Sequence, residues 1–141
     1  MTMFKYNAQI IANYPQLVGG VIIAEGLSNP PTPDSLREQY AAEQATVKAR
    51  IGDTPLSEIE SISAWRSAIS AFGVSPTKYR SAAESLLRRL TKKGDIPSIN
   101  TLVDIGNLVS IRYALPVAIF DMRQIAIPIT VKYADGGESF T

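Results

Sequence analysis

Residues 97–109, PSINTLVDIGNLV, join a connector to the start of a helix. The connector is Pro97–Asn100, and Thr101 and Asp104 after it have the spacing of a capping box. The apolar residues that follow recur at helical spacing on one side: Leu102, Ile105, Leu108 and Val109. The stretch therefore predicts a helix with Thr101 as its cap.

Three more helices are predicted upstream of this stretch. The first has Thr32 as its cap and stops at Gly52, and it directs Leu36, Tyr40, Val47 and Ile51 inward. The second begins near Thr54–Pro55, with a capping box of Ser57 and Glu60. Its inward stripe, including two aromatic residues expected in the core, is Ile59, Ile62, Trp65, Ile69 and Phe72. The third directs Leu86, Leu87 and Leu90 inward and closes at Lys92-Lys93-Gly94.

Strand-like runs flank the helices. Gly20–Ala24 is apolar and β-branched, Val117–Phe120 is apolar, and Ile129–Tyr133 alternates as a half-buried strand does. One strand, four helices and then strands predict an α+β fold, with the helices packed on a mostly antiparallel sheet. With 141 residues the chain is expected to form one domain, 1–141.

Composition excludes several classes of chemistry. The chain has neither cysteine nor histidine, so thiolate nucleophiles, disulfides and a histidine-based triad are all excluded. A carboxylate-only metal site stays open, but no ligand array indicates one, and no metal or organic cofactor is expected. The start of the chain lacks the pattern of a secretory signal, and Val18–Ala24 is too short to span a bilayer. A soluble, cytoplasmic protein without a membrane partner is expected.

Charge is unevenly distributed along the chain although the net charge is only +1. Residues 65–95 carry seven cations against two acidic residues, a local net of +5, and residues 25–60 carry seven acidic residues against three cations, a net of −4. The basic stretch fits a surface that contacts phosphates, and it also fits a solvated helix face with the usual charge bias. Charge alone favours the second interpretation. Arg80, Glu84 and Arg88 lie four residues apart, where they can pair.

Three polar residues gather near the start of the fourth helix: Asn100, Asp104 and Asn107. They could line a pocket, or Asp104 could be only the acidic half of the capping box and Asn107 a structural hydrogen-bonding group. Further along, Gly136-Gly137-Glu138 has the pattern of a tight turn with a carboxylate beside it. None of these residues identifies an activity by itself.

A longer pattern resembles a known family. The chain from Trp65 onward is similar to the B-three/B-four domain found in the beta subunit of bacterial phenylalanyl-tRNA synthetase, and to free-standing relatives of that domain. The residues that carry the resemblance are Trp65-Arg66, Phe72-Gly73-Val74, Pro76–Ser81, Glu84–Arg89, Gly94–Pro97, Ile99-Asn100, Leu102–Asp104, Asn107, Ser110, Leu115–Val117, Phe120-Asp121 and Gly136–Thr141.

The resemblance implies an editing function in translation quality control. In the synthetase this domain hydrolyses the ester of tyrosine wrongly attached to the phenylalanine tRNA. This chain would then be an aminoacyl-tRNA deacylase that acts in trans, with water as the nucleophile and tRNA or aminoacyl-tRNA as its partner. Alternatives left open are a non-catalytic module that binds tRNA or an amino acid, and an inactive fragment.

The resemblance also assigns residues. Asn100 and Asn107 would form the pocket wall, Glu138 would be a polar contributor, and Ala118 stands where the synthetase carries a histidine of its editing pocket. The candidate contacts to the tRNA backbone are Lys78, Arg80, Arg88 and Arg89. The family domain continues beyond the Gly-Gly-Glu motif with more strands and a catalytically important glutamate, so the chain is expected to be the N-terminal part of a truncated domain. The catalytic residue and the oligomeric state are left open.

Overall fold

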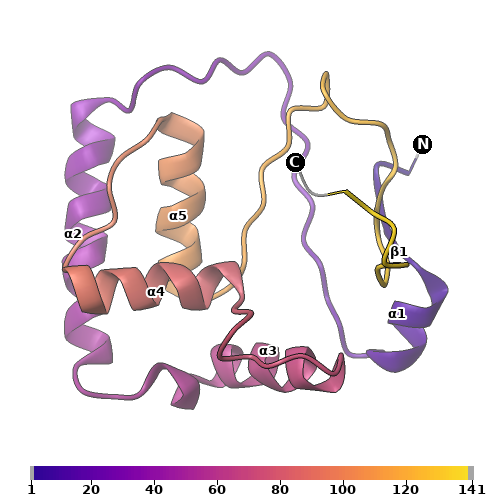
Figure 1. The fold of residues 1–141 in the computed structure, drawn as a ribbon. Helices are drawn as coiled ribbons and strands as arrows, with labels where there is room; N and C mark the ends of the chain where they lie inside the picture. The colour runs from indigo at the N-terminus through magenta and orange to yellow at the C-terminus, as the bar shows by residue number, and fades with distance from the viewer. Residues whose placement is uncertain (1, 140–141) are drawn as a thin grey trace. The chain divides into compact units, whose positions relative to one another are not determined.

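Helices dominate the computed structural model, which describes residues 2–139 (Figure 1). The elements in chain order are β1 (Phe4–Tyr6), α1 (Ala8–Asn13), α2 (Asp34–Ile51), the short 3-10 helix η1 (Leu56–Glu58), α3 (Glu60–Ala71), α4 (Ala82–Lys93), α5 (Thr101–Tyr113) and β2 (Ile129–Val131). They form two units: a helical unit, Ser28–Ile119, and a terminal unit built from the segment up to Leu27 and the segment from Phe120 onward.

The predicted fold class is wrong. Among the described residues the only sheet is the pair β1–β2, which is parallel, and no helix is packed on an antiparallel sheet. Gly20–Ala24 and Val117–Phe120 form no strand, and only residues 129–131 of the third run do. A β-branched run becomes a strand only where another strand completes its hydrogen bonds, and Ile22, 94% exposed, lies in solvent instead.

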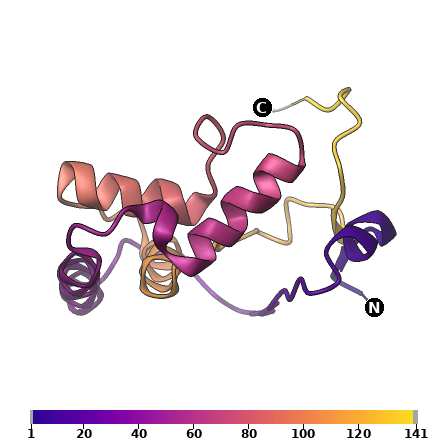
Figure 2. The same ribbon diagram turned by 90° about the horizontal axis from the view of Figure 1, so that it is seen from below.

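In the helical unit, α2 and α5 lie side by side and start at the same end, and α4 crosses them (Figures 1 and 2). The starts are joined because Thr101 donates from its backbone N–H to Pro30 O and Leu102 N–H donates to Asn29 Oδ1. The core between the helices consists of Tyr40, Val47, Ile51, Ile62, Ala83, Leu87, Leu90, Ile96, Ile111 and Ala114. Apolar periodicity predicted most of this core, but Phe72 is 45% exposed rather than buried.

Local capping sets the helix boundaries, with some shifts from the prediction. Ser81 caps α4 and Gly94, at φ 94°, ends it, as the Lys92-Lys93-Gly94 motif indicated. The cap of α5 is Asn100 rather than Thr101, since Asn100 Oδ1 accepts the Val103 N–H. Asp104 therefore lies one residue too far along for a capping box. The predicted box of Ser57 and Glu60 is likewise absent: Ser57 lies inside η1 and α3 has no side-chain cap.

The other ends of α2 and α5 are also fastened together. The Arg50 guanidinium donates to the backbone oxygens of Ile111 and Arg112 at 3.2 and 2.8 Å. These are among the last carbonyls of α5, which have no partner inside the helix, and a cation there also complements the helix dipole. Arg112 in turn pairs with Glu43 of α2 at 2.6 Å. The two helices are thus linked near both ends of α5.

The terminal unit joins segments from opposite ends of the chain. Phe4, Lys5 and Tyr6 pair with residues 129–131, and the Asn13 side-chain amide donates to the Tyr133 hydroxyl at 2.9 Å. Ile10 of α1 is buried. The β1 strand was not predicted, because three residues show no recognisable alternation. No helix among the described residues has the length and apolar character needed to cross a membrane.

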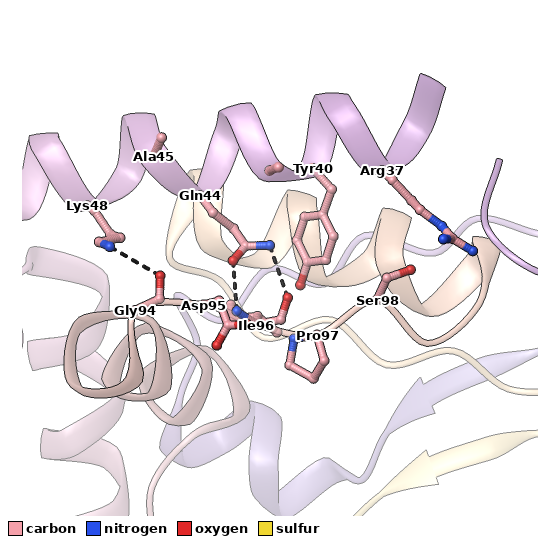
Figure 3. Close-up of a pocket in the computed structure, with 11 residues that line it drawn as sticks. Arg37, Tyr40, Gln44, Ala45, Lys48, Gly94, Asp95, Ile96, Pro97 and Ser98 are labelled. Carbon is pink, nitrogen blue, oxygen red and sulfur yellow. Dashed lines mark hydrogen bonds between the residues drawn. The ribbon is translucent and has the colours of Figure 1, made fainter. Parts of the chain in front are cut away.

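The connector between α4 and α5 is tied to α2 by one buried side chain (Figure 3). Gln44 accepts the Ile96 N–H at 2.7 Å and donates to Ile96 O at 3.1 Å. Lys48 binds Gly94 O from one turn further along α2. These contacts line a shallow groove of about 400 Å³ between α2 and the connector. The two hydrogen bonds from Gln44 satisfy both the N–H and the C=O group of Ile96, which is buried from water.

We expect Gln44→Ala to lower the free energy of unfolding by about 2 kcal/mol, since it leaves the buried Ile96 N–H and C=O unpaired. Gln39→Ala, at an exposed position of the same helix, is the matched control and is expected to change stability by less than about 0.5 kcal/mol. Urea denaturation followed by circular dichroism measures both. Equal stability of the two variants would contradict the role given to Gln44.

Candidate functional site

Asp104 is a fully buried carboxylate between the starts of α2 and α5. It accepts hydrogen bonds from the Thr32 hydroxyl at 2.6 Å, from the Ser98 hydroxyl and from the Ile99 N–H at 2.9 Å. Burial raises the pKa of Asp104, but these donors, Ser98 first, and the charge of Arg37 together lower it below its usual value. The side chain is therefore ionised in the folded protein, where it holds the connector and the start of α2.

The two predicted asparagines lie on α5 in different surroundings. Asn100 is the helix cap, so its side-chain oxygen is engaged by the Val103 N–H. Asn107 is half-buried and lies near Tyr40 of α2. The Tyr40 hydroxyl is buried and has no hydrogen bond of normal geometry among the described residues. Burial raises the pKa of Tyr40 to about 12, the Asn107 amide opposes this rise, and the charge of Asp104 adds to it.

Ala118 lies in the irregular segment after α5, and its side chain is exposed. Its two neighbours pack close to Gly106: a Cβ atom at Gly106 would lie 2.9 Å from Ile119 Cδ1 and 3.5 Å from Val117 Cγ1. The missing side chain of Gly106 thus lets the segment that carries Ala118 lie against α5, one residue before Asn107. Among the predicted pocket residues, Asn107 and Ala118 are the one pair that the structure brings into the same neighbourhood.

Glu138 belongs to the terminal unit, whereas Asn100, Asn107 and Ala118 belong to the helical unit. Its carboxylate accepts the N–H groups of Asp135 and Gly136 at about 2.9 Å and pairs with Lys132 at 3.2 Å. The Asp135 N–H is the largest cause that lowers the pKa of Glu138 to about 2. Glu138 thus closes the turn that the Gly-Gly-Glu motif predicted.

The basic residues divide into paired and unpaired ones. Arg66 donates to Glu84 Oε1 at 2.7 Å and to the Thr77 hydroxyl at 3.1 Å, while Arg80 approaches the same carboxylate oxygen at 3.6 Å. Glu84 is buried, and its Oε2 atom has no hydrogen-bond partner among the described residues. The predicted pairing of Arg80 with Glu84 is confirmed. Sequence spacing did not indicate Arg66, which reaches Glu84 from α3.

The remaining cations of this region make no ion pair within residues 2–139. Lys78 lies over the ring of Tyr79, with 5.3 Å from Nζ to the ring centre. The others, all on α4 and all without an acidic partner there, are Arg88, Arg89, Lys92 and Lys93. Arg80, Arg88 and Lys92 line a groove of about 410 Å³ between α4 and the loop Gly52–Ser57. Lys92 and Lys93 join the predicted contacts Lys78, Arg88 and Arg89 as cations available to a ligand.

We expect Asp104→Asn to destabilise the protein by about 2 kcal/mol at neutral pH, because the amide nitrogen cannot accept the donors that surround it. Because the pKa of Asp104 is lowered in the folded protein, its ionised carboxylate stabilises the fold at pH values above its unfolded-state pKa of about 4. This stabilisation is lost as the pH falls through the folded-state pKa. The stability difference between the native protein and the variant should therefore shrink on acidification. Asp53→Asn, at an exposed position, should retain the native acid sensitivity. A difference that stays constant down to low pH would contradict the assignment.

Comparison with known proteins identifies the family. The model of the B3/4 domain matches residues 64–141, more than half of the chain and the part that carries α4, α5 and the predicted site residues. No curated protein and no solved structure matches the chain. Phe140 and Thr141, at the end of the matched region, lie outside the described residues. The chain belongs to the B3/4 domain family, the domain found in the beta subunit of phenylalanyl-tRNA synthetase.

Proposed function

We propose that this protein binds tRNA through the cations of α4 and hydrolyses misacylated aminoacyl-tRNA in trans. Membership of the B3/4 family supports an editing or binding role related to tRNA synthetases. The observation that carries the proposal is the set of unpaired cations on and beside α4: Lys78, Arg88, Arg89, Lys92 and Lys93.

A cation without an acidic partner keeps its whole charge available to a phosphate group, whereas a cation in an ion pair is partly neutralised. On an ordinary solvated surface, charges of both signs are interspersed. The exposed part of α4 instead gathers four cations, and its one acidic residue, Glu84, is buried under Arg66 and Arg80. The resulting local field attracts phosphate groups and makes binding depend strongly on salt.

The chemistry must proceed without histidine. An aminoacyl ester is activated, so hydrolysis requires an oriented substrate, a positioned water molecule and donors for the developing oxyanion. The Asn107 amide is the first candidate for such a donor, because it is half-buried and lies beside the Tyr40 hydroxyl. Asn100 has its side-chain oxygen committed to the helix start but retains its NH₂ group. Tyr40 remains protonated at neutral pH and lies beside Asn107.

A non-catalytic module that binds tRNA or an amino acid is the second candidate. One observation favours it: the Glu138 carboxylate is engaged by backbone amides and Lys132, so it is not available as a general base in this arrangement. A cytoplasmic location, where aminoacyl-tRNA is available, is part of both proposals.

Deacylation separates the two candidates. We expect the purified protein to release the amino acid from at least one tRNA in a misacylated panel that includes tyrosine on the phenylalanine tRNA. Asn107→Ala should lower that rate by about 100-fold, as loss of an oxyanion donor does. Asn29→Ala, which removes an amide at the other side of the α5 start, controls for damage to the helix. If the folded protein binds tRNA but releases no amino acid, the binding-only module stands.

Binding itself is tested by the salt dependence of tRNA affinity. Replacing Arg88 and Arg89 together with glutamine should weaken tRNA binding and lower the slope of log K against log salt by about 2, one unit for each phosphate contact. Arg123→Gln and Lys132→Gln together make the same charge change in the terminal unit and should leave the slope near its native value. Filter binding over a salt series measures this, and an unchanged slope in the α4 variant would remove these contacts from the proposal.

A further inference from the structure

The cations on α4 and just before it lie on two sides of the helix. Arg88 and Lys92 are four residues apart on α4, and Arg80 precedes the helix, four residues before the buried Glu84. All three cations line the groove between α4 and the loop Gly52–Ser57. Arg89 and Lys93, each one residue further along, do not line it. We call the first set the groove-side cations and the second the outer cations. The two sets belong to the same region and differ in whether they face this groove.

The opposite wall of the groove contributes hydroxyl groups rather than charge of one sign. Thr54 and Ser57 come from the loop. Thr77, whose hydroxyl accepts from Arg66, and Thr91 of α4, whose hydroxyl donates to Arg88 O, complete the polar lining. Asp53 is the only acidic residue on the loop wall. Hydroxyl groups beside guanidinium and ammonium groups are the donors that bind phosphate and sugar oxygens in complexes with nucleic acids.

A hydrogen-bonded network around Glu84 forms the floor of the groove. Glu84 is buried and accepts from Arg66, which also donates to the Thr77 hydroxyl and to Pro76 O. Arg80 approaches Glu84 Oε1 at 3.6 Å, so its charge is partly neutralised by that carboxylate. Arg88 and Lys92 have no ion-pair partner within the described residues. The support therefore places two unpaired cations, Arg88 and Lys92, on the groove side of α4, with the paired Arg80 before them.

We propose that this groove binds an unpaired RNA strand through its phosphodiester backbone. From Arg88 to Lys92, a four-residue step along α4 advances about 6 Å, which matches the separation of neighbouring phosphates on an extended strand. A groove volume of about 410 Å³ is enough for a short piece of a single chain. The inference rests on the proposed binding of tRNA and adds which part of that RNA enters the groove.

The lining also predicts how the strand is recognised. No aromatic residue within 2–139 lines the groove, so the described lining offers bases no stacking platform. Binding should then depend on the length and charge of the strand and not on its sequence.

The test compares two variants with the same change of charge on the same helix: R88Q/K92Q for the groove side and R89Q/K93Q for the outer side. The ligands are a short unstructured RNA oligonucleotide, a duplex of the same length and whole tRNA. For the single strand, R88Q/K92Q should lose about tenfold or more in affinity at low salt and lower the salt slope by about 1.4. R89Q/K93Q, which removes cations already proposed to contact tRNA, should weaken binding of whole tRNA but should cost the single strand clearly less affinity than R88Q/K92Q does. The charge-preserving swap R88K/K92R should retain binding, and circular dichroism confirms that each variant is folded.

The outcomes distinguish this inference from the proposed function. Equal losses in the two glutamine variants, or a duplex bound as tightly as the single strand, would overturn the groove assignment while tRNA binding stands. A clear preference of the oligonucleotide for one base composition would overturn recognition through the backbone. If the native protein binds no tRNA at low salt, the proposed function itself fails.

Discussion

The helical unit depends on one buried charge. Asp104 lies where the chain enters both α2 and α5, and it binds a hydroxyl from each of two segments far apart in sequence, Thr32 and Ser98. A buried carboxylate costs a great deal of solvation energy, so it is tolerated only where donors surround it. Here the donors are supplied by the segments that must be brought together. The requirement to satisfy Asp104 therefore fixes how the connector and the start of α2 meet α5.

The rest of the helical unit follows from that junction. With α2 and α5 aligned from a common start, Arg50 reaches the last carbonyls of α5 and Gln44 faces Ile96 of the connector. The connector is short, so its attachment to α2 also fixes the position of the C-terminal end of α4 within the helical unit. The side of α4 that carries Leu87 and Leu90 is then buried, and the cations at its other positions are left to solvent. The basic surface is thus a consequence of how the core is assembled.

Sequence reasoning succeeded where the cause is local. The four main helices, the closing Gly94 and the pairing of Arg80 with Glu84 depend on residues within a few positions of each other. It failed where the decisive partner is distant: the two strand-like runs found no strand to pair with, and β1 was too short to recognise. At the site, spacing assigned Asp104 to a capping box, but a shift of the cap by one residue released it to bind Thr32. Arg66 and Glu84 meet across two helices, which periodicity within either helix cannot reveal.

The parallel pairing of β1 with β2 has a consequence for synthesis on the ribosome. Phe4 emerges early, but its partner Ile129 is made only after all of the helices, so the early segment must wait unpaired while the chain grows. The contacts of the helical unit lie within Ser28–Ile119 and can form as that stretch emerges. Closing the pair joins residues more than a hundred positions apart, which is slow compared with helix formation. The two units should therefore acquire their structure at different times, the helical one first.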